Sequence, residues 1–230
     1  DPHSFPTRRS SDLIMIGPSS SHTAGAVRLA KVASIIAGKN IMSVKFVLHG
    51  SFAKTYKGHG TDKALIAGIL GMDPWDDRLK DSMNIAKEAG LKVEFAFADL
   101  GDVHPNTVKF VITKKSGRVI EIIGSSVGGG NILIFKVDGE AVEFTGNYPT
   151  IIVRHKDIPG MISKVSTILY EGNVNIAFMN VYRNSRGLNA TMVFETDTIV
   201  GKDVLNKIKC MGNIYSIREI APLEIGRADV

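Results

Sequence analysis

The sequence predicts an α+β protein made of two successive units, and three features of its 230 residues support this. Over residues 24–90, apolar residues recur at helical spacing in three stretches, each followed by a glycine. Between residues 93 and 137, apolar and polar residues alternate with the period of a β-strand. After Asn147-Tyr148-Pro149 a new series of strand and helix signals begins. Early helices followed by strands joined through short turns are typical of a unit with a mostly antiparallel sheet.

The chain is expected to begin with a short strand, a helix and a full strand. Ile14-Met15-Ile16 is an apolar run that ends at a Gly-Pro pair. The next apolar residues, from Val27 to Ala37, have helical spacing, and Gly38 marks the end of that helix. Residues 44–49 alternate as a strand.

Two further helices are expected before the antiparallel strands. Thr61-Asp62 is predicted to cap a helix over residues 64–70. Residues 76–89 have the spacing of another helix. Gly71 and Gly90 follow these helices, where a terminal glycine is favoured.

The later part of the first unit is expected to be β-structure. Residues 93–98 form one predicted strand, and residues 108–113 and 119–123 form a hairpin over a Ser-Gly turn. A further strand, 132–137, ends at an Asp-Gly pair, which is typical of a tight turn.

The second unit is expected to follow the order βαββαβ, the split ferredoxin-like arrangement. Pro159-Gly160 opens its first helix, Gly172 ends that helix, and residues 184–187 form a turn between two strands. The predicted strands and helices cover residues 150–154, 159–170, 174–182, 189–195, 201–210 and 214–220.

The composition excludes several classes of protein. Hydrophobic residues make up 44% and charged residues 22% of the chain, which excludes a disordered or collagen-like protein. No apolar run approaches the length of a membrane span, and the net charge of +5 is spread along the chain. We therefore expect no membrane and no nucleic-acid partner, and a cytoplasmic location. The single cysteine, Cys210, excludes an internal disulfide and any iron–sulfur site ligated by this chain alone.

The first twelve residues are expected to be foreign to the protein. They lack the apolar segment of a secretory signal, and residues 5–12 match one translated frame of a common sequencing-adapter oligonucleotide. The expected organisation is therefore a tail over 1–12, a first domain over 13–145, a second domain over 148–222 and a short tail over 223–230.

The first candidate site is a run of hydroxyl side chains and a histidine before the first long helix. It reads Gly17-Pro18-Ser19-Ser20-Ser21-His22-Thr23. Hydrogen-bond donors at a helix N-terminus favour an anion such as a carboxylate or a phosphate. The alternative is a helix cap with a surface histidine, although a cap needs only one hydroxyl.

The second candidate site is Lys57-Gly58-His59-Gly60-Thr61-Asp62, in which a histidine lies between two glycines. The glycines allow a sharp bend that presents the ring to a ligand. A neutral histidine is also a common proton acceptor near neutral pH. A Gly-His-Gly turn is weak by itself, so an ordinary turn stays the alternative.

Two loops complete the set of candidates. In His104-Pro105-Asn106-Thr107, the amide of Asn106 can orient a carboxylate or an amine, and Pro105 stiffens the loop. Residues 124–130 (GSSVGGG) are expected to form a Gly-rich loop between strands. That loop lacks the Lys-Ser/Thr pair of a P-loop and the helix of a dinucleotide fingerprint, so nucleotide binding is not expected. Each loop could also be an ordinary connector.

Together, three motifs resemble the beta chain of bacterial iron–sulfur L-serine dehydratase (L-serine ammonia-lyase). They are residues 16–25 (IGPSSSHTAG), 58–62 (GHGTD) and 104–107 (HPNT), and their order and spacing are also similar to that family. The resemblance covers residues 14 to about 221. From Tyr148 onward the chain is similar to an ACT domain, and the first unit also resembles the allosteric substrate-binding domain of some phosphoglycerate dehydrogenases.

The resemblance implies a lyase that deaminates L-serine by dehydration. L-Serine loses its α-proton and its hydroxyl group, and the aminoacrylate hydrolyses to pyruvate and ammonia, in amino-acid catabolism and gluconeogenesis. In this family a [4Fe–4S] cluster held by three cysteines is the Lewis acid for the leaving hydroxyl. Because this chain has one cysteine, the resemblance implies that a separate alpha chain carries the cluster and that this chain holds no metal.

The resemblance also implies roles for the motif residues. His59 is the leading candidate for the base or acid, and His22 and His104 are the other catalytic candidates, with the choice among the three left open. Hydroxyl, carboxylate and amide groups are expected to line the substrate: Ser19, Ser20, Ser21, Thr23, Thr61, Asp62 and Asn106.

The ACT-like unit implies a sensor or a dimerisation module. Effector contacts are expected at His155, Asp157 and Asn175, and homo-association is expected through this unit. Asp157 stands where an Asn is usual, so a purely structural role stays open.

Two other functions stay open beside the enzyme. A non-catalytic amino-acid-sensing regulatory protein would need neither cluster nor partner, but a bare sensor needs only the ACT-like half. A fragment of a phosphoglycerate dehydrogenase would need a dinucleotide-binding fingerprint, which the sequence lacks. The motifs could still line a regulatory pocket instead of an active site.

Overall fold

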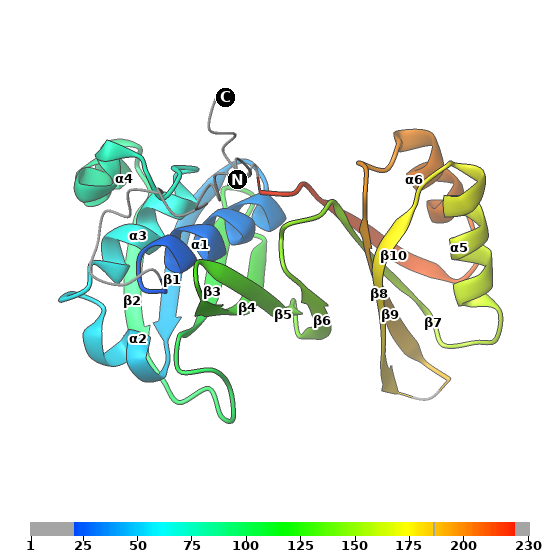
Figure 1. Cartoon of the computed structure of the whole chain (residues 1–230), viewed down its shortest axis with the longest axis horizontal. Coiled ribbons are helices and arrows are strands. Elements are labelled where there is room, and N and C mark those ends of the chain that lie inside the picture. The colour runs from blue at the N-terminus through cyan, green and yellow to red at the C-terminus, as the bar shows by residue number, and fades with distance from the viewer. Residues whose placement is uncertain (1–20, 186, 224–230) are drawn as a thin grey trace, which may run out of the picture.

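The computed structural model describes residues 21–185 and 187–223, which form two β-sheets, each with helices on one face (Figure 1). The first unit contains α1 (Ala24–Ala37), β1 (Ile41–Leu48), α2 (Gly50–Thr55), α3 (Thr61–Ile69), the 3-10 helix η1 (Asp77–Asp81), α4 (Ser82–Glu88), β2 (Lys92–Phe97), β3 (Thr107–Lys114), β4 (Val119–Gly128), β5 (Asn131–Val137) and β6 (Glu140–Phe144). Its strands lie in the order β2-β1-β3-β4-β5-β6. β1 and β2 are parallel, and the other paired neighbours in this sheet are antiparallel. The α+β prediction is confirmed.

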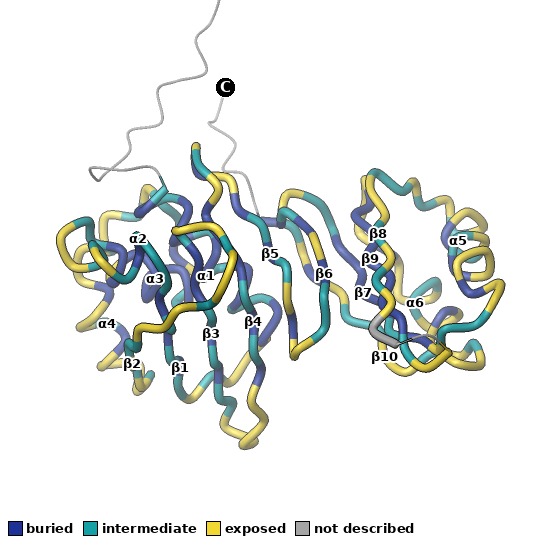
Figure 2. The backbone as a smooth tube through the Cα atoms, turned by 90° about the horizontal axis from the view of Figure 1, so that it is seen from below, coloured by how far each residue is buried: buried dark blue, intermediate teal, exposed yellow. Residues whose placement is uncertain are grey.

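One face of the six-stranded sheet is buried under α1, α2 and α3. Along β1 the buried residues Val44, Phe46 and Leu48 alternate with partly exposed ones, as the strand period requires (Figure 2). α1 packs on α3 and across β3, β4 and β5. The close approach of the two helices depends on Gly68, where an added Cβ would lie 2.3 Å from the carbonyl oxygen of Val27.

The second unit has the predicted βαββαβ order. Its elements are β7 (Thr150–Lys156), α5 (Met161–Glu171), β8 (Ile176–Ser185), β9 (Asn189–Thr196), α6 (Lys202–Lys209) and β10 (Ile214–Ile220). The strand order β10-β7-β9-β8 is antiparallel throughout, as in a ferredoxin-like fold. Ile151, Val153 and Phe194 face a core shared with α5 and α6.

The other face of the second sheet packs against the first unit. Ile152, Val193 and Ile220 belong to the same buried cluster as the core of the first unit. Polar contacts cross the same boundary. The backbone N–H and the hydroxyl of Thr145 both donate to Oε1 of Glu195, at 3.1 and 3.0 Å.

Two helical segments before residue 89 differ from the sequence prediction. α2 was not predicted, because only Phe52 of its six residues is buried. Residues 76–89 divide into η1 and α4, because the side chain of Asp76 caps a tighter 3-10 turn by accepting from the N–H of Arg78.

The predictions of a Thr61-Asp62 helix cap and of a Gly-rich loop over residues 124–130 were also wrong. Thr61 lies inside α3, whose N-cap is Gly60 with φ of 69°. Residues 124–128 belong to β4, where Gly124 allows close packing, since an added Cβ would lie 2.7 Å from Cδ1 of Ile134. Only 129–130 form a turn, and Gly128, Gly129 and Gly130 all have positive φ.

Several predicted segments lie outside the described residues. These are the tail over 1–12, the strand 14–16 and all of the segment 223–230 except Leu223. The domain limits at 145 and 148 stay predictions. Among the described helices, none combines the length and the apolar character that a bilayer crossing requires.

Candidate active site

The centre of the candidate site is a pair of histidine rings from two of the predicted motifs. His22 and His59 lie edge to face, with ring centroids 4.8 Å apart. His22 directly precedes the N-cap of α1, and His59 lies in the turn between α2 and α3. The packing of α1 on α3 therefore brings together residues that are far apart in the sequence.

The His22 ring is enclosed. It is 8% exposed, its other edge contact is the ring of Phe52 at 5.2 Å, and its Nε2 lies 3.2 Å from the hydroxyl of Ser51. Burial lowers the pKa of His22, and the neighbouring His59 lowers it further. The neutral imidazole is thus favoured, which leaves one ring nitrogen able to accept a proton.

Several buried polar atoms of the candidate segments lack a hydrogen-bond partner. Among the described residues, seven buried side-chain atoms lack such a partner, and five of them belong to Thr23, His59, Thr61, Asn106 and Ser126. Buried polar groups are normally paired, so five unpaired atoms within the candidate segments indicate a polar ligand. Three hydroxyls can donate, and Oδ1 of Asn106 can accept. This set suits a ligand that carries both a carboxylate and an ammonium group.

The hydroxyl of Thr23 does not serve the helix. Thr23 is the N-cap of α1, yet its side chain makes no capping hydrogen bond. The cap alternative therefore does not account for Thr23. Its backbone carbonyl starts the helix by accepting from the N–H of Val27 at 2.9 Å.

The start of α1 is seated on β4. An added Cβ on Gly25 would lie 2.0 Å from Oγ of Ser126, so only glycine allows this approach. The backbone N–H of Ser126 in turn donates to the carbonyl of Asn106 at 3.0 Å. Contacts thus connect the first motif, β4 and the His104-Asn106 loop.

The third motif is only partly directed into the site. His104 is exposed, and its Nδ1 accepts from the backbone N–H of Asn106 at 3.1 Å, which stabilises the loop. Oδ1 of Asn106 is buried and unpaired. The structure therefore favours Asn106 over His104 as a ligand contact.

The remaining predicted substrate residues differ in their surroundings. Asp62 is buried, and its Oδ1 accepts from the N–H of Lys63 at 2.8 Å in the first turn of α3, where a carboxylate stabilises a helix. Ser21 is half-buried directly before His22. Ser19 and Ser20 lie outside the described residues.

The three predicted effector residues of the second unit do not meet within one chain. His155 and Asp157 lie at the end of β7, which pairs with the start of β9. Asn175 precedes β8 at the opposite end of the sheet, and its amide donates to Asp197 at 2.6 Å. A hydrogen bond from the N–H of Gly187 lowers the pKa of Asp157, and the charge of Arg183 lowers it further. These two contacts of Asp157 stabilise the β8–β9 hairpin.

The described residues do not form a metal site. No group of three or more His, Cys, Asp or Glu side chains among them could hold a metal ion, and Cys210 is exposed at the end of α6. The residues present therefore do not fit an iron–sulfur cluster held by this chain.

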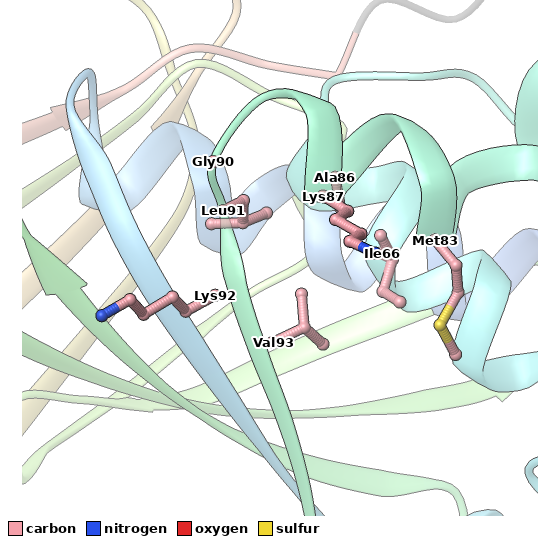
Figure 3. A pocket seen from close by; sticks show the side chains of 8 residues that line it. All are labelled: Ile66, Met83, Ala86, Lys87, Gly90, Leu91, Lys92 and Val93. Atoms are coloured by element: carbon pink, nitrogen blue, oxygen red, sulfur yellow. The ribbon is translucent and has the colours of Figure 1, made fainter.

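A separate hollow lies between α3, α4 and β2 (Figure 3). It has a volume of about 470 Å³ and a mainly apolar lining that includes Ile66, Met83 and Leu91. None of the candidate site residues lines it, so it is not the site described above.

Sequence analysis missed three residues of the site: Ser51, Phe52 and Ser126. Ser51 and Phe52 lie in the unpredicted helix α2, and Ser126 lies in the segment expected to be a loop. Ser126 stands in a Gly-Ser-Ser run that was interpreted as part of a Gly-rich loop, so its hydroxyl was the available signal.

Comparison with known proteins identifies relatives of both units. Residues 12–90 match the family described as "Serine dehydratase beta chain", and residues 149–209 match "ACT domain". The L-serine dehydratase beta chain of Peptoniphilus asaccharolyticus is 48% identical over 185 residues, which cover 80% of this chain and 83% of that protein. The probable L-serine dehydratase beta chain of Bacillus subtilis (strain 168) is 40% identical over 208 residues, which cover 90% of this chain and 94% of that protein. The chloroplastic D-3-phosphoglycerate dehydrogenase 3 of Arabidopsis thaliana is 30% identical over 158 residues, which cover 64% of this chain and 26% of that protein.

Proposed function

Because the chain belongs to the L-serine dehydratase beta-chain family, we propose that it is the beta subunit of an L-serine ammonia-lyase. The observation that carries the proposal is the set of unpaired buried polar atoms in the same segments as the contacting pair His22 and His59 and in the neighbouring loop and strand. Its donors and its acceptor match the carboxylate and ammonium groups of an amino acid.

The proposed reaction removes water across Cα and Cβ of L-serine. The Cα–H bond breaks and its proton passes to a base, the electron pair forms the double bond, and the hydroxyl leaves Cβ. The aminoacrylate tautomerises to an imine, and water converts this to pyruvate and ammonia. The reaction consumes neither oxidant nor reductant, so this chain needs to supply a base and groups that bind the substrate.

We assign the proton transfer to His59. Its Nδ1 is buried without a partner, whereas Nε2 of His22 faces Ser51 and Nδ1 of His104 accepts from its own loop. A base must lie within hydrogen-bond reach of the proton that it removes, and an unpaired buried nitrogen meets that need. His22 then holds the His59 ring in place by their edge-to-face contact.

We assign substrate binding to the hydroxyls and the amide around this pair. Thr23 and Thr61 would donate to the carboxylate, together with Ser19, Ser20 and Ser21, and Oδ1 of Asn106 would accept from the ammonium group. Asp62 is assigned to the stability of α3, since its carboxylate is already paired with the N–H of Lys63.

The proposal includes a companion alpha chain. The [4Fe–4S] cluster that the family uses supplies a Lewis acid for the leaving hydroxyl, and we place its ligands on that chain because this one has a single cysteine. We also place the enzyme in the cytoplasm.

The test is release of pyruvate from L-serine under anaerobic conditions. We expect turnover when the chain is co-expressed with an alpha-type chain and none from either chain alone. Co-purification of the two chains without turnover would contradict the catalytic assignment. It would favour the second candidate, an amino-acid-sensing regulatory protein, which the similarity to a phosphoglycerate dehydrogenase supports. Calorimetry of the free chain with L-serine would then detect binding at the same polar groups.

For the ACT unit we propose homo-association through the edge strand β8. Its unpaired edge carries the exposed side chains of Phe178, Met179 and Val181, and an exposed apolar edge readily pairs with a second strand. Val181→Lys should shift the oligomer to a smaller species in light scattering, whereas Tyr215→Lys, on the opposite edge, should not. Effector contacts at His155, Asp157 and Asn175 would need residues from two chains, because one chain separates them.

A further inference from the structure

Ser51 lies where the three motifs of the candidate site meet, although it belongs to none of them. Its hydroxyl is 3.2 Å from Nε2 of His22. A hydroxyl can either donate or accept, so this contact suits either neutral form of the imidazole. The next residue, Phe52, places its ring against the same histidine.

The backbone of Ser51 is held on both sides. Its N–H donates to the carbonyl of Pro105 at 2.8 Å, and its carbonyl accepts from the hydroxyl of Thr55 at 2.9 Å. Gly50 makes the first contact possible. It has φ of +55°, and an added Cβ would lie 2.6 Å from the same carbonyl oxygen. The start of α2 is therefore seated directly on the His104-Pro105-Asn106 loop.

The surroundings of His22 leave its ring little freedom. Phe52 and His59 approach it edge to face, with centroids at 5.2 and 4.8 Å and interplanar angles of 71° and 85°. Rotating the imidazole by half a turn about its bond to Cβ would fit the same space, but would place a ring carbon where Nε2 now faces Ser51. Shape alone thus permits two ring orientations, and the observed one places Nε2 against the Ser51 hydroxyl.

We propose that Ser51 is a positioning residue that selects the ring orientation of His22 through Nε2. The same residue joins the Pro105 loop to the histidine pair, so that the three motifs keep one relative arrangement. The structural part of this inference is independent of the reaction. Its effect on turnover rests on the proposed function.

The first test reads the His22 ring directly in the free full-length chain. Nitrogen NMR of ¹⁵N-histidine-labelled protein, assigned with a His22→Gln variant, reports the state of each ring nitrogen. We expect Ser51→Ala to shift the His22 Nε2 resonance and Ser51→Thr, which keeps the hydroxyl, to restore it. Lys54→Ala is the matched control, since it truncates an exposed side chain of the same helix and leaves the hydrogen bonds of Ser51 in place. Unchanged His22 resonances in Ser51→Ala would overturn the proposal.

The second test measures turnover of L-serine in the assembled enzyme. We expect Ser51→Ala to lower kcat about 10- to 100-fold with KM changed less than about twofold, since misplacing a supporting group has effects of this size. Ser51→Thr should recover most of kcat. An equal loss in Lys54→Ala would assign the effect to α2 as a whole and overturn the proposal. If the assembled wild type does not turn over L-serine, the proposed function fails, and the NMR result still decides the role of Ser51.

Discussion

The contact between α1 and α3 sets the geometry of the histidine pair, and Gly68→Ala perturbs it directly. An added Cβ would lie 2.3 Å from the carbonyl oxygen of Val27 and 2.6 Å from Cβ of Ala30, whereas ordinary contacts are 3.4–4 Å. The two helices must therefore separate by about 1 Å, because a close-packed interior has no space to absorb the methyl group.

The expected loss of stability in Gly68→Ala follows from two opposing contributions to the free energy of unfolding. Overpacking costs about 1–3 kcal/mol, and replacing glycine by alanine in a helix returns at most about 1 kcal/mol. We expect a lower melting temperature, by about 2–4 °C for each kcal/mol of net loss. Since His22 precedes α1 and Thr61 begins α3, a 1 Å separation should also lower kcat, by up to about 100-fold.

Thermal unfolding and L-serine turnover of the assembled enzyme measure the two effects of this substitution. Gly212→Ala is the control, because an added Cβ there has nothing within 4 Å and the residue does not have positive φ. It should leave both properties unchanged. A Gly68→Ala variant with wild-type melting temperature and wild-type kcat would show that α1 and α3 do not approach as described.

Three further predictions follow from the same structure. His59→Ala should lower kcat about 10²- to 10⁴-fold if its ring transfers the proton, and a loss below about tenfold would assign that role to another group. Burial and the neighbouring His59 hold the folded-state pKa of His22 below its ordinary value of about 6.5. The unfolded chain therefore binds more protons, and stability should fall as pH drops below about 6.5. Chemical denaturation from pH 7.5 to 5.5 should show a weaker fall in His22→Gln, and an equal fall would refute the assignment. Glu195→Ala should cost about 1–3 kcal/mol because it leaves the donors of Thr145 unpaired. Replacement of the exposed Glu143 should cost less in the same denaturation experiment.

The sequence predicted the elements whose burial pattern is long and regular. Residues 27–37 show helical spacing because nine residues of α1 are buried, and the second unit showed its βαββαβ order for the same reason. The six residues of α2 lacked such a pattern, because that helix is fixed by the carbonyl of Pro105, more than fifty positions away in the chain. Gly124 was assigned to a loop, whereas it lies in β4 and lets Leu29 and Ile134 pack closely.

The candidate site was predictable only in part. Residue types and family resemblance indicated His22, His59 and Asn106, but the spacing of these residues in the sequence does not predict their contacts. Ser51 and Ser126 could not be selected, because a single serine becomes significant only when folding places its hydroxyl beside a particular atom. Ranking the three histidines likewise required their hydrogen-bond partners.

The burial of Ile152, Val193 and Ile220 in the core of the first unit has a consequence for how the whole chain melts. β6 is an edge strand of the first sheet and also packs against β8 and β9 of the second sheet. Detaching the ACT unit would therefore expose apolar surface on both units. The two units should therefore lose their structure together, in one calorimetric transition, although each matches a family of its own. We therefore expect the ACT unit to unfold as a part of one cooperative body, and not as a module appended to it.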